Sequence, residues 1–325
     1  MSIILVFLIL LIGVINSGLN ALIITGIVVI CFSKFKFENI LLFLIFGQLL
    51  GVIFVVSLAY SGVIENLLVV RLGVERHALG FLNPNTVSNY LFTIALKIIY
   101  LAKNRHNWIP LFLSNIILFM VMLETNSRTS LILMILFNLI YIFYFFMKIQ
   151  GYSTLFLRLI YFLDKISFIG LFILSIISAI LFSYSNPIMV RINQIFSNRI
   201  SSAGQFYQQY GFSFIGQKVE LVSTYKASQL GARALILDNG YLQLLIIYGL
   251  VATIIFSLYW FNLIKNFKNK SEHILLVIAL IYTIYGFNSG LFLSWEYNFL
   301  LFYSINNMKK GDKNENSNTN ISGIQ

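Results

Sequence analysis

The sequence has little charge and almost no cysteine. Asp, Glu, Lys and Arg together make up 10% of its 325 residues, whereas hydrophobic residues make up 59%. About a quarter of the residues of an average soluble domain are charged, so this composition excludes a soluble globular protein and predicts an integral membrane protein. The one cysteine, Cys31, lies inside an apolar run, which excludes a disulfide framework and a cysteine-based metal site.

Motifs for nucleotides and metals are also absent. The sequence contains no Walker loop, no glycine fingerprint for dinucleotides, no HExxH pair and no cluster of His, Cys and acids with metal-ligand spacing. We therefore expect no metal and no cofactor. The net charge of +11 does not indicate nucleic-acid binding, because the basic residues lie mostly in short segments between apolar runs, as membrane topology alone requires.

Long apolar segments predict an all-α polytopic membrane protein with about ten transmembrane helices. We expect residues 1–308 to form a single transmembrane domain and residues 309–325 to form a disordered cytosolic tail. The first segment follows Met1 without a basic region or a cleavage site, so we interpret it as a retained span. Two external loops, 62–85 and 185–240, are much longer than the other connections. The apolar segments cover residues 2–15, 19–33, 39–61, 86–102, 109–123, 130–147, 166–184, 241–262, 273–287 and 292–306.

Lysine and arginine are distributed differently between the two sides of the predicted membrane. The connections after every second segment are rich in lysine, so the positive-inside rule places them and both termini in the cytosol. The opposite connections contain mostly arginine, which that rule does not explain. Because guanidinium binds phosphate through two parallel hydrogen bonds, we hypothesise an anionic ligand at the outer side. The basic residues of the outer connections are Arg71, Arg76, Arg128, Arg191, Arg199, Lys218, Lys226 and Arg233.

Three polar clusters lie at the outer N-termini of predicted helices. They are residues 76–86, 126–130 and 233–241. A helix N-terminus has unpaired N–H groups and a partial positive charge, so three of them beside arginines would form an anion pocket. Taken singly, the small polar side chains of these clusters are more simply explained as N-caps. These side chains are Asn85, Thr86, Ser127, Thr129, Asp238 and Asn239.

Capping does not explain Arg128, because an arginine at the membrane boundary is costly and usually functional. We therefore expect Arg128 to act in catalysis. Asp238 is a candidate cap, arginine partner or general base, and His77 is a candidate base or a passive surface contact. We expect Glu296 to pair with an outer arginine, and Lys97 to extend its ammonium group to the cytosolic interface.

Four stretches, in this order, resemble the Wzy-type polysaccharide polymerases of the broader O-antigen polymerase and ligase group. The stretches are residues 76–85 (RHALGFLNPN), 127–130 (SRTS), 199–217 and 237–250. Asn83 stands where family members often have histidine, which weakens the assignment of a base to that position. The resemblance implies a GT-C-like, metal-independent, inverting glycosyltransferase of the bacterial cytoplasmic membrane. Such an enzyme joins undecaprenyl-diphosphate-linked repeat units on the outer side and releases undecaprenyl diphosphate.

Residue chemistry and this resemblance together assign roles to individual side chains. Arg128, Asp238 and His77 would act in catalysis, and a second set would bind the diphosphate and the glycan. The implied partners are lipid-linked glycans, the bilayer, and the flippase and chain-length regulator of the same pathway. The binding set comprises Arg76, Asn83, Asn85, Ser127, Arg191, Arg199, Arg233, Asn239 and Tyr241.

Two other functions stay open at this point. A ligase of the same group would transfer finished glycan to a different acceptor with the same anion pocket. A transporter or flippase of an anionic lipid-linked glycan is the third hypothesis. Transporters tend to place ionisable residues near the membrane midplane on broken helices, whereas the predicted spans are nearly free of charge at their centres.

Overall fold

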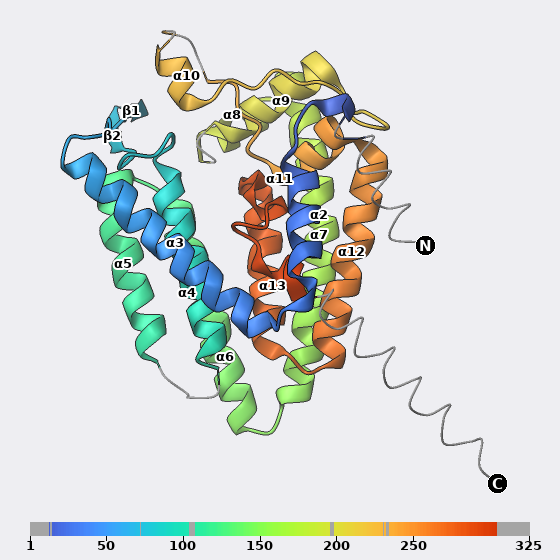
Figure 1. Ribbon diagram of the computed structural model, residues 1–325. Coiled ribbons are helices and arrows are strands. Elements are labelled where there is room, and N and C mark those ends of the chain that lie inside the picture. Colours follow the sequence, from blue (N-terminus) through green and yellow to red (C-terminus); the bar gives the residue numbers. More distant parts are fainter. Residues whose placement is uncertain are drawn as a thin grey trace.

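The structure is a computed structural model that describes residues 13, 15–71, 73–103, 108–195, 198–229, 231 and 234–303. Its long helices form a bundle (Figure 1). One end of the bundle carries the strands and the short helices, and we call it the upper end, as it is drawn in Figure 1. The lower end carries the connections around Lys103, Gly151 and Ser271.

The long helices form two groups. Helices α3, α4 and α5 stand on one side in Figure 1, α7, α12 and α13 stand on the other, and α6 contacts both groups. α13 packs against α7, α6 and α12, so it lies at the centre of the bundle. The bounds are α2 Ala21–Cys31, α3 Phe37–Tyr60, α4 Asn85–Leu101, α5 Ile109–Thr125, α6 Arg128–Ile149, α7 Ser153–Ser183, α12 Gly249–Asn269 and α13 His273–Asn288.

Short elements cover the upper end. A two-stranded antiparallel hairpin lies above α3 and α4, helices α8 and α9 lie at the top of the second group, and α10 lies above them towards the hairpin (Figure 1). α11 continues through a π-helical turn, η2, into α12, and 3₁₀ turns occupy three other places. The bounds are β1 Leu68–Arg71, β2 Val74–His77, α8 Pro187–Ile195, α9 Arg199–Tyr210, α10 Thr224–Gln229, α11 Gly240–Leu242, η2 Gln243–Tyr248, η1 Phe32–Lys34, η3 Gly290–Leu293 and η4 Phe299–Phe302.

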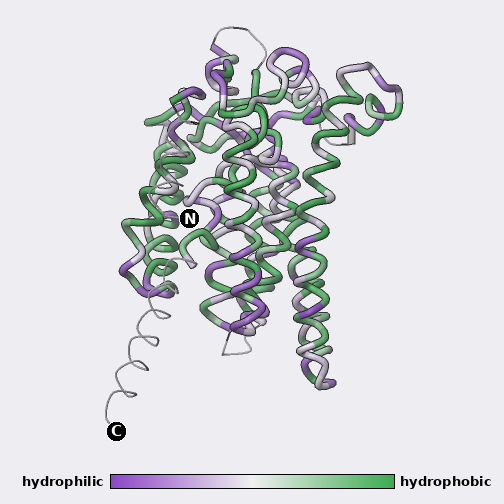
Figure 2. The backbone as a smooth tube through the Cα atoms, turned by 90° about the vertical axis from the view of Figure 1, so that its right-hand side faces the viewer, coloured by the Kyte–Doolittle hydropathy of each residue, from purple (hydrophilic) through white to green (hydrophobic). Residues whose placement is uncertain are grey.

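The helices are apolar on their outer faces as well as inside the bundle. Phe46 and Phe54 on α3 and Phe112 on α5 are 67%, 65% and 68% exposed. Within the described residues, four helical runs are long and apolar enough to cross a membrane: Phe37–Tyr60, Arg128–Ile149, Ser153–Ser183 and Gly240–Asn269. Figure 2 shows the hydrophobic colour along the helices, with hydrophilic stretches gathered towards their ends. The chain therefore has the architecture of an all-helical, polytopic membrane protein.

Two expected spans differ from the structure. The span expected at 166–184 is the upper part of α7, which begins at Ser153 and contains Arg158 and Lys165. The span expected at 292–306 does not form a helix over residues 292–303, where the chain makes the turns η3 and η4. Asn298 breaks the helical pattern there, because its side chain accepts from the N–H of Leu300. Irregular backbone at this depth is tolerated because protein surrounds it. The expected span 2–15 lies outside the described residues, apart from Gly13 and Ile15.

Two buried charged side chains lie inside the helix bundle. Lys97 was expected to reach the interface, and this prediction is wrong, because the side chain is fully buried and its ammonium group donates to Gln48 Oε1 at 2.6 Å. Gln48, on α3, in turn donates through Nε2 to the backbone carbonyl of Glu296. Asp164 on α7 is also fully buried and accepts a hydrogen bond from Thr283 Oγ1 at 2.9 Å. The bundle interior is thus more charged than the sequence predicts.

The long loop between α7 and α12 is fixed to the start of α12 by backbone contacts. Residues 213–217 exchange hydrogen bonds with residues 245–251, among them Gln217 N–H to Ile247 O at 3.0 Å and Leu250 N–H to Ser213 O at 2.9 Å. Gly216 and Gly249 meet where the two segments approach most closely, since a Cβ on Gly249 would lie 2.4 Å from the Gly216 nitrogen. Both glycines have positive φ, which other residues rarely adopt. Two stretches that carry the family resemblance therefore pack directly on each other.

Candidate functional site

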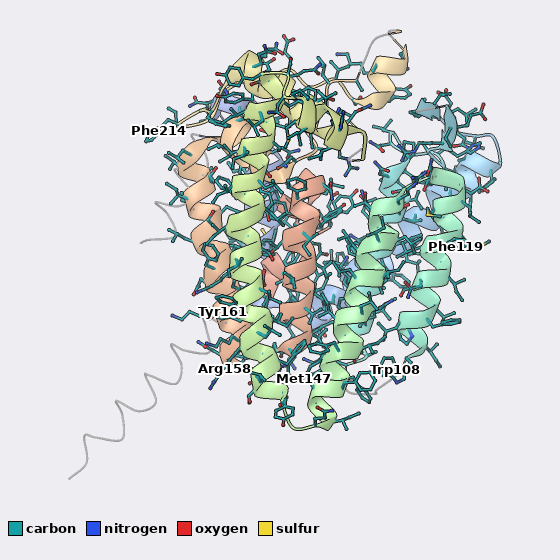
Figure 3. All side chains as sticks on the ribbon, turned by 180° about the vertical axis from the view of Figure 1, so that it is seen from behind. Trp108, Phe119, Met147, Arg158, Tyr161 and Phe214 are labelled. Atoms are coloured by element: carbon teal, nitrogen blue, oxygen red, sulfur yellow. The ribbon has the colours of Figure 1, made fainter. Side chains whose placement is uncertain are left out.

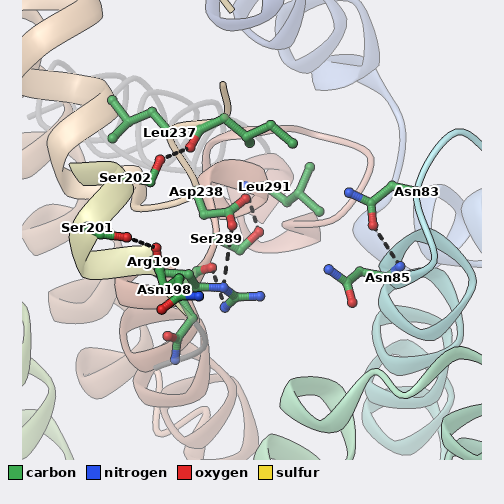
Figure 4. A network of polar contacts seen from close by, with 12 residues as sticks. Asn83, Asn85, Asn198, Arg199, Ser201, Ser202, Leu237, Asp238, Ser289 and Leu291 are labelled. Atoms are coloured by element: carbon green, nitrogen blue, oxygen red, sulfur yellow. Dashed lines mark hydrogen bonds and ion pairs between the residues drawn. The ribbon is translucent and has the colours of Figure 1, made fainter. Parts of the chain in front are cut away.

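A cavity of about 500 Å³ lies at the upper end of the bundle, between the two groups of helices. This volume is within the range of small-molecule sites. Its wall is formed by the start of α4, the start of α6, Arg199 at the start of α9, residues 236–243, and residues 285–297 that follow the end of α13. Figure 4 shows Arg199 and Asp238 on one side of this space, and Asn83 and Asn85 on the other.

Asn83 and Asn85 form the α4 side of the wall. Asn85 begins α4, and the Asn83 carboxamide oxygen accepts a hydrogen bond from the Asn85 N–H at 2.9 Å. Pro84 between them has a helical backbone conformation, which its fixed φ favours at a helix start. The two amides are therefore held in place by the local turn and both line the cavity.

Arg76 lies behind this wall and is only 6% exposed. Its Nε donates to the backbone carbonyl of Thr125 at 2.8 Å, and its Nη2 donates to Asn85 Oδ1 at 2.6 Å. The guanidinium group thus connects β2, the end of α5 and the start of α4. Arg76 does not line the cavity, so the structure makes it a residue that positions Asn85.

We expect Arg76→Ala to lower the free energy of unfolding by about 1–3 kcal/mol, because it leaves the buried Thr125 carbonyl and the partly buried Asn85 Oδ1 without this donor. Arg76→Lys should be nearly as destabilising, since an ammonium group cannot reproduce the forked geometry of guanidinium. Thermal unfolding of the purified chain in detergent measures both effects. An unchanged unfolding midpoint for Arg76→Ala would contradict this positioning role.

Among the described residues, Arg199 is the arginine that lines the cavity. Its Nη1 donates to the backbone carbonyl of Asn288 at 2.7 Å, and its Nε lies 3.4 Å from Asp238 Oδ2. The Arg199 side chain is 17% exposed and that of Asp238 is 39% exposed, so the pair is partly screened by solvent. Arg199 is therefore oriented by α13 while the Asp238 carboxylate stays accessible from the cavity.

The start of α6 contributes Ser127 and Thr129 to the cavity wall. Ser127 is almost completely buried and its N–H donates to Thr125 Oγ1 at 3.3 Å. Arg128 lies between them but points elsewhere: its side chain is exposed, and its Nε donates to Asn126 Oδ1 at 3.1 Å. The structure thus brings two neighbours of Arg128 to the cavity, but not the Arg128 side chain.

The remaining site candidates among the described residues do not line the cavity. Asn239 is an N-cap that accepts from the Leu242 N–H and donates to Ser175 Oγ, and Tyr241 is fully buried with its hydroxyl on the Thr283 carbonyl. His77, on β2, lies 3.2 Å through Nδ1 from the Asn66 amide nitrogen. Arg191 is exposed on α8. Arg233 lies outside the described residues.

Sequence reasoning missed the side of the cavity formed around the end of α13. Tyr285, Asn288 and Ser289 line it there, and Glu296 and Tyr297 line it from the irregular segment that follows. The polar run Asn288–Ser289 after an apolar helix is the signal that could have indicated this wall. Glu296 was expected to pair with an arginine; within the described residues its carboxylate instead accepts from Tyr90 OH at 3.4 Å.

The cavity wall contains both signs of charge. Among the described residues, its charged side chains are Arg199, Asp238 and Glu296. Arg199 supplies a guanidinium group for an anion, and the carboxylates supply proton acceptors. The asparagine and serine side chains around them can donate to and accept from hydroxyl groups. Such a wall suits a ligand that is anionic at one point and rich in hydroxyl groups elsewhere.

Comparison with known proteins identifies no relative. No protein-family model matches the chain, and searches of curated proteins and of solved structures give no match either.

Proposed function

We propose that this chain polymerises lipid-linked oligosaccharide repeat units at the upper end of the bundle. The observation that supports this best is the cavity itself, which collects side chains from four separated stretches that resemble the Wzy-type polymerases. Asn83 and Asn85 come from the first stretch, Ser127 from the second, Arg199 from the third and Asp238 from the fourth. This proposal places the chain in the bacterial cytoplasmic membrane, with the upper end outside and both termini in the cytosol.

In the proposed reaction, a hydroxyl oxygen of the acceptor sugar attacks the anomeric carbon of the donor glycan. The new glycosidic C–O bond forms as the bond to the diphosphate breaks, with inversion at the anomeric carbon. The electron pair passes to the diphosphate oxygen, which Arg199 stabilises, and the hydroxyl proton passes to the Asp238 carboxylate. The amides of Asn83 and Asn85 would orient the sugars opposite.

The resting ion pair fits this sequence of events. Arg199 pairs with Asp238 across 3.4 Å in the structure. A diphosphate is a stronger partner for guanidinium than one carboxylate, because it presents more acceptor oxygens and more charge. Binding of the donor would therefore draw Arg199 to the phosphates and release Asp238 to accept a proton.

Deletion of the gene, followed by sizing of the lipid-linked glycans, tests this function. A polymerase deletion should leave single repeat units on the undecaprenyl carrier, because their joining is blocked while their synthesis continues. A ligase deletion would instead leave full-length polymer on that carrier. Normal surface polymer in the deletion strain would contradict both assignments.

Transport is a second candidate, because Lys97 and Asp164 are buried within helices of the bundle. Ionisable residues at such depth often mark a transport path. Neither residue lines the cavity, and they contact different helices, Lys97 by Gln48 of α3 and Asp164 by Thr283 of α13. Accumulation of repeat units on the cytosolic leaflet in the deletion strain would favour transport over polymerisation.

A further inference from the structure

Two lysines from different helices share one aromatic ring near the lower end of the bundle. Lys165 Nζ on α7 and Lys268 Nζ on α12 each lie 4.7 Å from the centre of the Tyr161 ring. Neither ammonium group pairs with a carboxylate within the part of the chain that the structure describes. Arg158 lies one helical turn below Tyr161 on α7, and Figure 3 labels both residues near the lower end. The packing of α7 on α12 thus concentrates positive charge there.

An apolar groove runs along the same pair of helices. It is lined by Phe168, Ile169 and Phe172 of α7 and by Leu250, Ile254 and Leu258 of α12, among others. The residues from Phe261 to Leu250 extend over about 16 Å of helix. The groove therefore begins about one turn above Lys165 and continues upward between α7 and α12.

Small side chains on α12 make this groove hollow. Thr253 and Ser257 also line it, and at its lower end the ring of Phe168 lies against that of Phe261 with their centres 5.1 Å apart. The hydroxyls donate along their own helix, Thr253 Oγ1 to Gly249 O at 2.9 Å and Ser257 Oγ to Thr253 O at 2.7 Å. With these polar groups already bonded, the groove presents a hydrocarbon surface.

The level of the lysines matches a bilayer boundary. α7 has 31 residues, and is therefore about 46 Å long, which exceeds a hydrocarbon core of about 30 Å. From Lys165 to the upper end at Ser183 the helix rises about 27 Å, close to that thickness. With the upper membrane boundary placed at Ser183, Lys165 would lie at the level where the headgroup phosphates of the opposite leaflet begin.

We propose that this surface binds an anionic phospholipid of the bilayer, with its phosphate between Lys165 and Lys268 and an acyl chain in the groove between α7 and α12. The charge of the headgroup complements the two ammonium groups, and the acyl chain complements the apolar groove directly above them. Basic residues between helices, at the level of one leaflet, are the usual recognition element for anionic lipids. This site is separate from the cavity and does not depend on the reaction performed there.

Native mass spectrometry of the purified full chain in detergent tests the proposal, with phosphatidylglycerol as the probe and phosphatidylcholine of the same acyl chains as the comparison. We expect the chain to retain phosphatidylglycerol in preference to phosphatidylcholine. The double variant Lys165→Gln, Lys268→Gln should lower the affinity by about 30-fold, since each lysine contributes about 1 kcal/mol. The matched control is Lys34→Gln, Lys36→Gln, which removes the same charge from exposed sites and should bind as the parent does.

A second variant examines the groove without changing the charge. Ser257→Phe places a large ring in the groove lining and should also weaken phosphatidylglycerol binding, while thermal unfolding confirms that the variant is folded. Inorganic phosphate alone should not raise the unfolding midpoint as the lipid does. Equal binding of the two lipids, equal binding by the double variant and the parent, or equal protection by inorganic phosphate would each overturn the proposal.

Discussion

Replacing Arg199 with alanine is expected to lower polymer formation by about 10²- to 10³-fold, because one donor to the charge that develops on the leaving diphosphate is lost. Arg199 is the arginine whose side chain lines the cavity in the described structure. Arg199→Lys should recover part of the rate, since it retains the charge but not the paired donors. The length and amount of lipid-linked glycan made by membranes containing each variant measure the effect.

Two comparison variants sharpen this test. Lys226→Ala removes an exposed positive charge from the same long loop and should leave polymer formation unchanged. Arg128→Ala tests the sequence-based hypothesis that Arg128 acts in catalysis, although its side chain does not line the cavity. A loss from Arg128→Ala as large as that from Arg199→Ala would mean that the exposed arginine reaches the substrate. A normal polymer from a well-expressed Arg199→Ala chain would refute the role of Arg199.

Asp238→Asn is expected to lower the rate by about 10²- to 10⁴-fold, the usual cost of removing a general base. The substitution keeps the size of the side chain but removes its capacity to accept a proton. Glu296→Gln is the matched control, because it changes the second carboxylate of the same wall. A single-turnover assay with purified lipid-linked repeat units measures the chemical step separately from export.

Comparison of the two carboxylate variants identifies which side chain accepts the proton. If Asp238→Asn turns over normally while Glu296→Gln is inactive, the proton acceptor is Glu296, and Asp238 serves to orient Arg199. If both variants turn over normally, no carboxylate of this wall acts as the base. Amounts of folded protein should be matched in each comparison, since Asp238 also contributes an ion pair.

Much of the helical architecture follows from hydropathy. Segments such as 39–61 and 130–147 correspond to α3 and α6 within a few residues, because a run of apolar side chains in lipid can satisfy its backbone groups only as a helix. Hydropathy did not predict the start of α7. Arg158, Asp164 and Lys165 made residues 148–165 look like a connection, yet they lie within one continuous helix. Charged residues inside a helix are compatible with a membrane when partners or the interface accommodate them.

The irregular structure of residues 292–303 could not be predicted for a related reason. Residues 292–303 are mostly apolar, as in a span, but most of their side chains are buried by protein, as Phe292, Phe299 and Leu300 illustrate. Hydropathy does not distinguish contact with lipid from contact with other helices. The burial of Lys97 could not be predicted from hydropathy either, since only the tertiary structure brings Gln48 within reach of its ammonium group.

The site was predicted best where polar residues end or begin helices. Asn83, Asn85, Ser127 and Asp238 line the cavity because their helices start beside it. For Asn239 the simpler explanation as an N-cap describes its contacts. The sequence could not decide which arginines face inward, because that depends on side-chain direction: Arg199 is turned inward by the Asn288 carbonyl, whereas Arg128 folds back on Asn126.

The contacts of Gln48 couple the shape of the cavity to the membrane. α3 exposes a broad apolar face, and its Gln48 amide is bonded both to Lys97 and to the backbone of Glu296 in the cavity wall. A helix of this kind tilts when the surrounding hydrocarbon becomes thinner. Such a tilt would displace the Glu296 backbone. The acyl-chain length of the host lipids would therefore change the geometry of the cavity wall.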